Sequence, residues 1–175
     1  MPLWLQRRLW VRAEIERRLD TRAEVLFAQH HESHAAAAFG ASPFEEAAVL
    51  TLDGVGEWTP NALWAARGAA LEPLADLRYP HSLGRLYSAF TAYCGFAVND
   101  GEYKLMGLAP YGEPRHVDVI LDRLVALGDD GAYALAPEYF DYRTSERMTS
   151  ARFHALFGGP PADPALPPGA READL

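Results

Sequence analysis

Three histidines stand within five residues, in the run His30-His31-Glu32-Ser33-His34. Neutral imidazoles bind divalent transition metals, and residues four apart in a helix lie one above the other on the same face. If a helix begins at His30, the rings of His30 and His34 can reach one metal ion, while His31 points elsewhere. The alternative interpretation is that these histidines cap a helix and are partly buried.

A carboxylate follows the next predicted strand. Asp53 ends the apolar run 47–52 and is followed by Gly54 and Gly56. Two histidines and one carboxylate with open positions suit divalent iron or zinc. The alternative is a turn aspartate that bonds its own backbone amides. The glycine turn could also bind phosphate on its amides, although a lone Gly-x-Gly is a weak signal.

The basic residues are almost all arginine. Lys104 is the only lysine among 16 basic side chains. A lysine supplies a compact positive charge suited to phosphate, so Lys104 is a candidate anion contact. A surface lysine without a specific role is the competing interpretation.

The elements that must position these residues are predicted from apolar periodicity and turn signals. Strands are expected over 24–29, 47–52, 61–66 and 71–77, helices over 3–19, 30–40, 82–95, 102–108, 117–127 and 145–157, and an extended segment over 133–142. A turn is expected at 99–101, and Cys94 is expected in the core. From residue 158 onward, Pro and Gly dominate, which is typical of a loop or linker with little to bury. This order predicts an α/β fold with a partly antiparallel sheet.

Composition narrows the function classes. The chain has 175 residues, a formal net charge of −8 and 49% hydrophobic residues. The acidic balance argues against nucleic acid or an anionic membrane as partner. No apolar run approaches the roughly 18 to 20 residues that a membrane span needs. The single cysteine and the absence of a secretory pattern predict a cytoplasmic protein.

Five motifs resemble a known family when they are taken together and in order. They are 30–35 (HHESHA) with Ala38-Phe39, 42–44 (SPF), 52–58 (LDGVGEW), 80–88 (PHSLGRLYS) and 101–112 (GEYKLMGLAPYG). The sequence resembles the N-terminal catalytic domain of the O-carbamoyltransferases of antibiotic and nodulation-factor biosynthesis. The resemblance covers about residues 25–157.

This resemblance implies an activity and a fold. The fold would be part of an actin-like ATPase (ribonuclease H-like) domain, with a mixed sheet and flanking helices, related to the enzymes that form threonylcarbamoyladenosine in tRNA. In the family, a C-terminal YrdC-like domain makes carbamoyl adenylate from ATP and carbamoyl phosphate. The N-terminal domain then transfers the carbamoyl group to a hydroxyl of a small molecule such as an antibiotic or a sugar.

The resemblance also implies roles for single residues. His30, His34 and Asp53 would hold a divalent metal, with iron the expected ion, and a further aspartate ligand would lie beyond Leu175. Asp53, Gly54, Gly56 and Lys104 would contact the phosphate of the cofactor. His31 and Lys104 are the candidate catalytic residues, with His31 as general base.

The family pattern predicts more chain than the sequence contains. Residues 1–159 would be part of the catalytic domain and 160–175 a tail, with the first strands expected before Met1 and the nucleotide-binding segment after Leu175. The chain is therefore expected to be an internal fragment, whose missing lobe and YrdC-like domain act in trans. A non-catalytic metal-binding or interaction fragment is the main alternative. Another actin-like enzyme, such as a sugar kinase, is disfavoured by the paired histidines.

Overall fold

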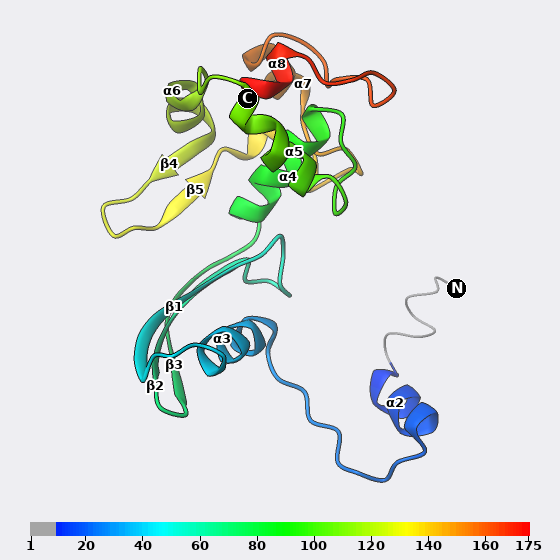
Figure 1. The fold of residues 1–175 in the computed structure, drawn as a ribbon, viewed down its shortest axis with the longest axis vertical. Coiled ribbons are helices and arrows are strands. Elements are labelled where there is room, and N and C mark those ends of the chain that lie inside the picture. The colour runs from blue at the N-terminus through cyan, green and yellow to red at the C-terminus, as the bar shows by residue number, and fades with distance from the viewer. Residues whose placement is uncertain (1–9) are drawn as a thin grey trace.

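The structure is a computed structural model that describes residues 10–175 (Figure 1). Its elements are α2 (Val11–Leu19), α3 (His30–Gly40), β1 (Glu46–Leu52), β2 (Asn61–Arg67), β3 (Ala70–Leu77), α4 (Leu83–Tyr93), α5 (Glu102–Leu108), η1 (Ala109–Tyr111), α6 (Val117–Val119), η2 (Ile120–Leu124), β4 (Val125–Leu127), β5 (Tyr133–Leu135), η3 (Pro137–Tyr139), α7 (Ala151–Leu156) and α8 (Ala170–Ala173). The predicted helix over 3–19 is confirmed from Val11, and its first part lies outside the described residues. No helix among residues 10–175 is both long and apolar enough to cross a membrane.

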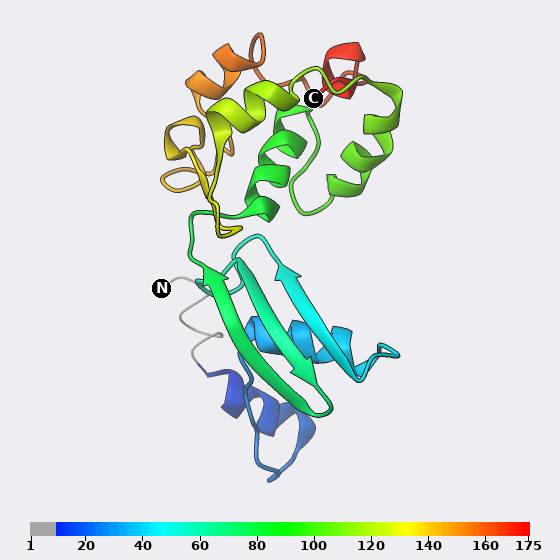
Figure 2. The same cartoon turned by 90° about the vertical axis from the view of Figure 1, so that its left-hand side faces the viewer.

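The predicted hairpin strands form a three-stranded antiparallel sheet in the order β1-β2-β3. α3 lies across one face of this sheet (Figure 2). Burial alternates along the end of β1, because Val49 and Thr51 are buried while Leu50 and Leu52 are exposed. This alternation is what a strand covered on one face requires.

Four consecutive alanines explain how α3 packs so closely on the sheet. Alanine has the highest helix propensity, and its small side chain lets a helix approach a neighbouring element. Ala35 is fully buried and Phe39 nearly so, in a core with Trp64 and Ala66 of β2. The predicted helix and its end at Gly40 are therefore confirmed.

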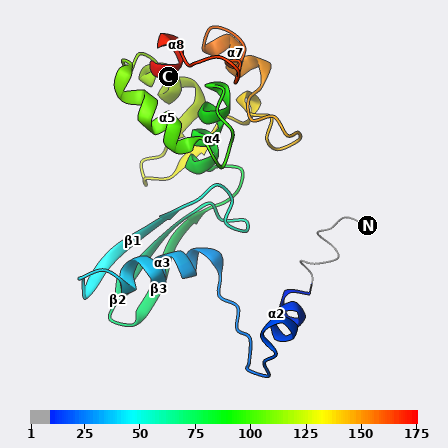
Figure 3. The ribbon, with the colours of Figure 1, turned by 45° about the vertical axis from the view of Figure 1, so that its right-hand side comes forward.

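α4 is the centre of the second part of the molecule (Figure 3). Its cap is Ser82, whose hydroxyl accepts a hydrogen bond from the backbone N–H of Arg85 at 3.0 Å, as the sequence predicts. Tyr93 of α4 is fully buried and packs edge-on against Phe153. Cys94 is buried beside it, which confirms its predicted place in the core.

The predicted strand over 24–29 is wrong. This segment runs between α2 and α3 without a strand partner among the described residues, and Leu26 and Phe27 are exposed. An apolar run forms a strand only where a neighbouring strand satisfies its backbone groups. The mixed sheet is not observed either, since every strand pair in residues 10–175 is antiparallel.

Three predictions for the second half are only partly right. The helix over 117–127 breaks into α6 and the π-helical turn η2, and then becomes β4, which pairs with β5. The extended segment over 133–142 keeps only β5 as a strand, with Phe140 bridged to Thr149. The helix over 145–157 begins at Ala151, capped by Ser150. The apolar spacing over 117–127 fits a helix, but it also fits a chain that ends in a hairpin strand burying Val125 against Leu135. Tertiary packing decides between the helix and the strand.

The Pro- and Gly-rich tail is irregular for most of its length, but it is not detached. The hydroxyl of Tyr93 donates to the carbonyl of Gly159 at 2.7 Å, and the N–H of Ala162 donates to the carbonyl of Tyr93 at 2.8 Å. α8 buries Glu172 and Ala173. Glu172 and Ala173 are the only buried residues between 158 and 175, so the expectation that this tail has little to bury is confirmed for most of its length and fails at α8. The domain boundary at residue 159 stays a prediction.

Candidate metal centre

Two elements bring the three predicted ligands together. α3 begins at His30, so that the rings of His30 and His34 lie one turn apart, and β1 ends directly before Asp53. The two Nε2 atoms are 3.0 Å apart. Oδ2 of Asp53 lies 2.5 Å from Nε2 of His30 and 3.6 Å from Nε2 of His34.

The spacing of these donor atoms fits a single metal ion. Zinc lies roughly 2.1 Å from nitrogen and oxygen ligands, which places donors about 3.0 Å apart at a right angle and about 3.4 Å apart in a tetrahedron. The separations of 3.0 Å between the two histidines and 3.6 Å between His34 and Asp53 lie near these values, while His30 and Asp53, 2.5 Å apart in a short hydrogen bond, would have to separate slightly. Two imidazole nitrogens and one carboxylate oxygen are also a donor set that iron and zinc accept. The residues present therefore fit a divalent transition metal.

The carboxylate of Asp53 is held from several sides. Its Oδ1 accepts a hydrogen bond from the N–H of Gly54 at 2.5 Å, and its backbone carbonyl accepts one from the hydroxyl of Ser82 at 2.8 Å. Burial alone would raise the pKa of Asp53, but the hydrogen bonds from His30 and Gly54 outweigh burial and lower it. Asp53 is thus ionised at neutral pH, as a metal ligand must be.

His31 points away from this group and into the space under the sheet. Its Nδ1 lies 2.7 Å from the hydroxyl of Thr51, whose oxygen lies 3.2 Å from the carbonyl of Ala62. The tautomer of His31 sets the direction of its bond to Thr51: Nδ1 donates if Thr51 donates to Ala62, and Nδ1 accepts if the ring proton is on Nε2 and is directed to the backbone of Thr59. Burial, followed by the neighbouring His30, lowers the pKa of His31 and favours its neutral ring.

Two of the three ligands, His30 and Asp53, line an open groove. His30, Asp53, Gly54 and Gly56 line one side of it, and residues at the start of α4 line the other. The groove has a volume of about 710 Å³. It is large enough for a small-molecule substrate beside the metal ligands.

Comparison with known protein families places this geometry in context. The family described as "Carbamoyltransferase N-terminus" matches residues 3–166. The chain belongs to this family. The match covers most of the sequence, including all three candidate ligands.

Curated relatives agree with this assignment. The protein sll1178 of Synechocystis sp. is 50% identical over 183 residues, an alignment that covers 100% of this chain and 30% of the relative. The nodulation protein NolNO of Sinorhizobium fredii is 36% identical over 138 residues, covering 77% and 20%. The nodulation protein NolO of Bradyrhizobium diazoefficiens is 36% identical over 104 residues, covering 59% and 19%. The chain thus spans between about a fifth and a third of the length of these relatives.

Lys104 is not brought to the groove in this member of the family. It lies on α5, where its Nζ is 3.7 Å from Oδ2 of Asp100 and lies over the ring of Tyr103. It does not line the groove that the candidate metal ligands border. Its predicted contact with phosphate therefore has no geometric support in this structure and stays a prediction.

Arg85 is the groove residue that the sequence reasoning missed. Its Nε is buried without a hydrogen-bond partner, and a Cβ added to Gly54 would lie 3.8 Å from it. The side chain therefore lies beside the glycine turn, where its positive charge can meet an anion. The signal in the sequence was its place three residues after the helix cap Ser82, because the first turn of a helix favours anions.

Glu102 is a second missed residue of the groove. Its Oε1 accepts hydrogen bonds from the hydroxyl of Ser88 at 2.9 Å and from the N–H of Asn99 at 3.0 Å. Burial alone would raise the pKa of Glu102, but these hydrogen bonds and others from the backbone lower it. Glu102 thereby ties the start of α5 to α4 along the wall of the groove.

Proposed function

We propose that this chain is the part of an O-carbamoyltransferase that transfers a carbamoyl group from carbamoyl adenylate to a hydroxyl of a small molecule, such as an antibiotic or a sugar. The observation that carries the proposal is the convergence of His30, His34 and Asp53 beside a groove, in a chain that belongs to the carbamoyltransferase family. The actin-like fold stays part of this proposal. So does a cytoplasmic location, which Cys94 as a free thiol supports.

His30, His34 and Asp53 would hold the divalent metal, for which we propose iron. When bound, the ion supplies a Lewis acid that polarises an oxygen of the carbamoyl or phosphate group. The chain contributes the orientation of the donors, since α3 fixes both imidazoles and hydrogen bonds fix the carboxylate. A rigid donor set of this kind reduces the reorganisation that the reaction requires.

The groove side chains and the glycine turn would bind the adenylate. We assign anion contacts to the backbone amide of Gly56 and to the guanidinium of Arg85, whose residues line the groove. The amide of Gly54 already donates to Oδ1 of Asp53 and would have to leave that bond to contact the phosphate. Lys104 is a further candidate that would have to move to reach the groove. These groups neutralise the negative charge that develops as the phosphate leaves.

His31 is the proposed general base. In the step, the acceptor hydroxyl oxygen attacks the carbamoyl carbon, and the bond between that carbon and the phosphate oxygen breaks. AMP leaves with the electrons of this bond, and the hydroxyl proton goes to Nε2 of His31. In this structure Nε2 of His31 is buried beside Gly56 and does not line the groove, so the His31 ring would have to turn toward the groove to accept this proton.

Carbamoyl adenylate itself would be made elsewhere in the enzyme. The chain covers only 20–30% of the relatives with the longest alignments. We therefore propose that a YrdC-like domain, together with the remaining lobe of the catalytic domain, makes it from ATP and carbamoyl phosphate. These segments would act in the same protein or in trans.

Metal content is the first test of this proposal. The chain is purified without oxygen, and iron and zinc are measured per chain beside His34→Ala. His116→Ala serves as a matched control, because His116 packs against Phe157 and not in the metal group. We expect near-stoichiometric metal in the wild-type chain and in the control, and loss in His34→Ala. Metal retained in His34→Ala would contradict the assigned ligands.

Carbamoyl transfer is the second test. The chain is mixed with the remaining segments of the enzyme, ATP, radiolabelled carbamoyl phosphate and hydroxylated acceptors, and label in the acceptor is measured. We expect transfer that depends on His30 and His34. Metal binding without transfer would instead favour a non-catalytic interaction fragment, for which the exposed Leu26 and Phe27 offer an apolar surface.

A further inference from the structure

Tyr133, the first residue of β5, is a half-buried side chain that the proposed function leaves without a role. β5 pairs with β4, and Leu135, two residues further along, is buried in the core around α4. Alternate residues of a strand share one face, so the Tyr133 ring lies on the same side of the hairpin as Leu135. Its hydroxyl, at the end of this ring, reaches two other elements.

The Tyr133 hydroxyl joins two segments that are distant in the sequence. It donates to Oδ1 of Asn61 at the start of β2, at 2.5 Å, and accepts from the backbone N–H of Leu83 at the start of α4, at 3.0 Å. Asn61 is only 4% exposed, and the N–H of Leu83 belongs to the first turn of a helix, which has no partner within the helix itself. Burial raises the pKa of Tyr133, so the hydroxyl keeps the proton that it donates.

The same two segments hold the backbone of the candidate metal ligand Asp53. Directly before β2, the carbonyl of Pro60 accepts a hydrogen bond from the N–H of Asp53 at 2.7 Å. Directly before α4, the hydroxyl of Ser82 donates to the carbonyl of Asp53 at 2.8 Å. Each of these partners is the chain neighbour of a residue that the Tyr133 hydroxyl binds. The backbone of Asp53 is therefore held from two sides, and Tyr133 connects the two sides.

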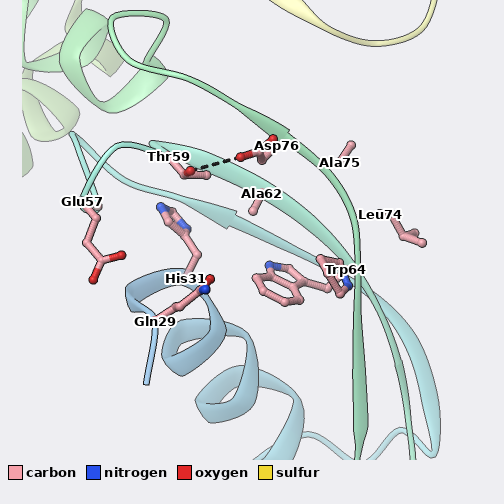
Figure 4. A pocket seen from close by; sticks show the side chains of 11 residues that line it. Gln29, His31, Glu57, Thr59, Ala62, Trp64, Leu74, Ala75 and Asp76 are labelled. Atoms are coloured by element: carbon pink, nitrogen blue, oxygen red, sulfur yellow. Dashed lines mark hydrogen bonds between the residues drawn. The ribbon is translucent and has the colours of Figure 1, made fainter. Parts of the chain in front are cut away.

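A different hydrogen bond anchors the chain before β2 within the sheet. The hydroxyl of Thr59 donates to the carboxylate of Asp76 on β3 at 3.1 Å (Figure 4). Pro60, the next residue, is fully buried. The bond between Thr59 and Asp76 connects the sheet to itself, whereas the Tyr133 hydroxyl connects the sheet to α4. The relative position of β2 and α4 at Asp53 therefore depends on Tyr133 in a way that it does not depend on Thr59.

We propose that Tyr133 is a positioning residue for the metal ligand Asp53. Its hydroxyl keeps the starts of β2 and α4 at the separation that places the carboxylate of Asp53 beside both imidazoles of α3. Both imidazoles are carried by one helix, so a change in this separation moves the carboxylate relative to both of them. The effect on the metal rests on the proposed function, while the connection through Tyr133 rests on the hydrogen bonds alone.

Metal affinity is the first test, with Co²⁺ as the probe. Co²⁺ accepts the same imidazole and carboxylate donors as iron and zinc, and its visible absorption reports its coordination. The metal-free chain is titrated against a competing chelator, beside Tyr133→Phe, which removes one oxygen atom. Loss of a side chain that supports a metal ligand typically lowers metal affinity about 10- to 100-fold, and we expect about tenfold here. An unchanged affinity and spectrum in Tyr133→Phe would overturn the proposal.

Tyr142→Phe is the matched control. The Tyr142 hydroxyl donates to the carbonyl of Pro80 at 3.1 Å, so this variant also removes a hydroxyl that binds the segment entering α4. Neither Tyr142 nor Pro80 is a chain neighbour of a partner of the Asp53 backbone. We expect Co²⁺ affinity close to that of the wild type. An equal loss of affinity in both variants would show that general loosening of this segment is sufficient, and would refute a specific role of Tyr133.

Hydrogen exchange of the Asp53 amide tests the connection without any metal. The metal-free chain is transferred into heavy water and followed by NMR, with the slowest amides of β1 and β2 as the internal reference for global stability. We expect the Asp53 amide to exchange about fivefold faster in Tyr133→Phe than in the wild type, relative to this reference, because its bond to Pro60 is less well held. Exchange at the wild-type rate would refute the connection.

The two measurements separate this inference from the proposed function. No Co²⁺ binding by the wild-type chain would overturn the metal assignment, and with it the effect of Tyr133 on the metal, while hydrogen exchange would still decide on the connection. Co²⁺ binding that is equal in the wild type and Tyr133→Phe would leave the proposed function standing and overturn the positioning role. Faster exchange together with weaker Co²⁺ binding in Tyr133→Phe, and neither in Tyr142→Phe, is the result that supports both.

Discussion

Replacing Gly56 by alanine tests the contact between the glycine turn and His31. Gly56 has φ +47°, a conformation that favours glycine, and a Cβ at this position would fall on Nε2 of His31. The same Cβ would lie 2.9 Å from Cδ2 of His31 and 3.0 Å from the carbonyl of Thr59. Neither neighbour can give way easily, since the His31 side chain is buried and the Thr59 carbonyl is part of the backbone.

The size of the effect follows from two contributions. Left-handed backbone costs alanine about 1–2 kcal/mol. Displacing the His31 ring breaks its buried hydrogen bond to Thr51, which costs about 1–3 kcal/mol more. We therefore expect Gly56→Ala to lower the free energy of unfolding by about 2–5 kcal/mol.

Gly68 offers a matched control, because it also has positive φ (+56°) but a Cβ there would meet nothing within 4 Å. Gly68→Ala should cost only the backbone contribution, about 1–2 kcal/mol. Urea unfolding of both variants, followed by circular dichroism, gives the two free energies. Equal losses in the two variants would refute the argument that Gly56 is required by its approach to His31.

Three further predictions concern the packing of α4 and α5. Ser82→Ala should lower the free energy of unfolding, measured by urea denaturation, by about 2 kcal/mol, because the hydroxyl both caps α4 and donates to the carbonyl of Asp53. The control Ser33→Ala, at an exposed position, should change this free energy little. Cys94 should resist alkylation in the folded chain and react after unfolding. Burial raises the pKa of its thiol to about 12, which leaves about a thousandfold less thiolate than its ordinary pKa of 9.0. Fast labelling of the native chain, measured by mass spectrometry, would contradict this burial. Glu102 has a lowered pKa, so its contribution to stability is present above its ordinary pKa of 4.5 and is lost as the pH falls through the lower value of the folded state. Glu102→Gln should therefore weaken the dependence of stability on pH in this acid range, and an unchanged dependence would show that the hydrogen bonds from Ser88 and Asn99 do not stabilise the carboxylate.

The elements predicted correctly are those whose signals are local. The side chain of Ser82 caps the start of α4, and the alanines after His34 have high helix propensity whatever α3 packs against. The hairpin of β2 and β3 is short and turns at Gly68, so its pairing needs no distant partner. The spacing of His30 and His34 belongs to the same class, because one turn of helix is enough to bring their rings together.

The failures concern features that depend on distant neighbours. Residues 24–29 have the composition of a buried strand, but no strand pairs with them among the described residues. The role of Arg85 became visible only when α4 packed against the turn at Gly54. The charge of Lys104 suggested a phosphate contact, but its position could not be predicted from the sequence, and the structure pairs it with Asp100.

The position of Asp53 depends on both parts of the molecule. β1 delivers Asp53 to the histidines of α3, while the hydroxyl of Ser82 binds its carbonyl and Gly84 packs on its backbone, where a Cβ would lie 2.7 Å from the carbonyl oxygen. The two histidines, in contrast, are fixed by one helix. A small shift of α4 would therefore move the carboxylate relative to both imidazoles. The separation of 3.6 Å between Asp53 and His34 already exceeds the roughly 3.4 Å of a tetrahedral site, so such a shift would act first on this pair of ligands. Metal affinity is thus expected to report on the packing of α4 as well as on the ligands themselves.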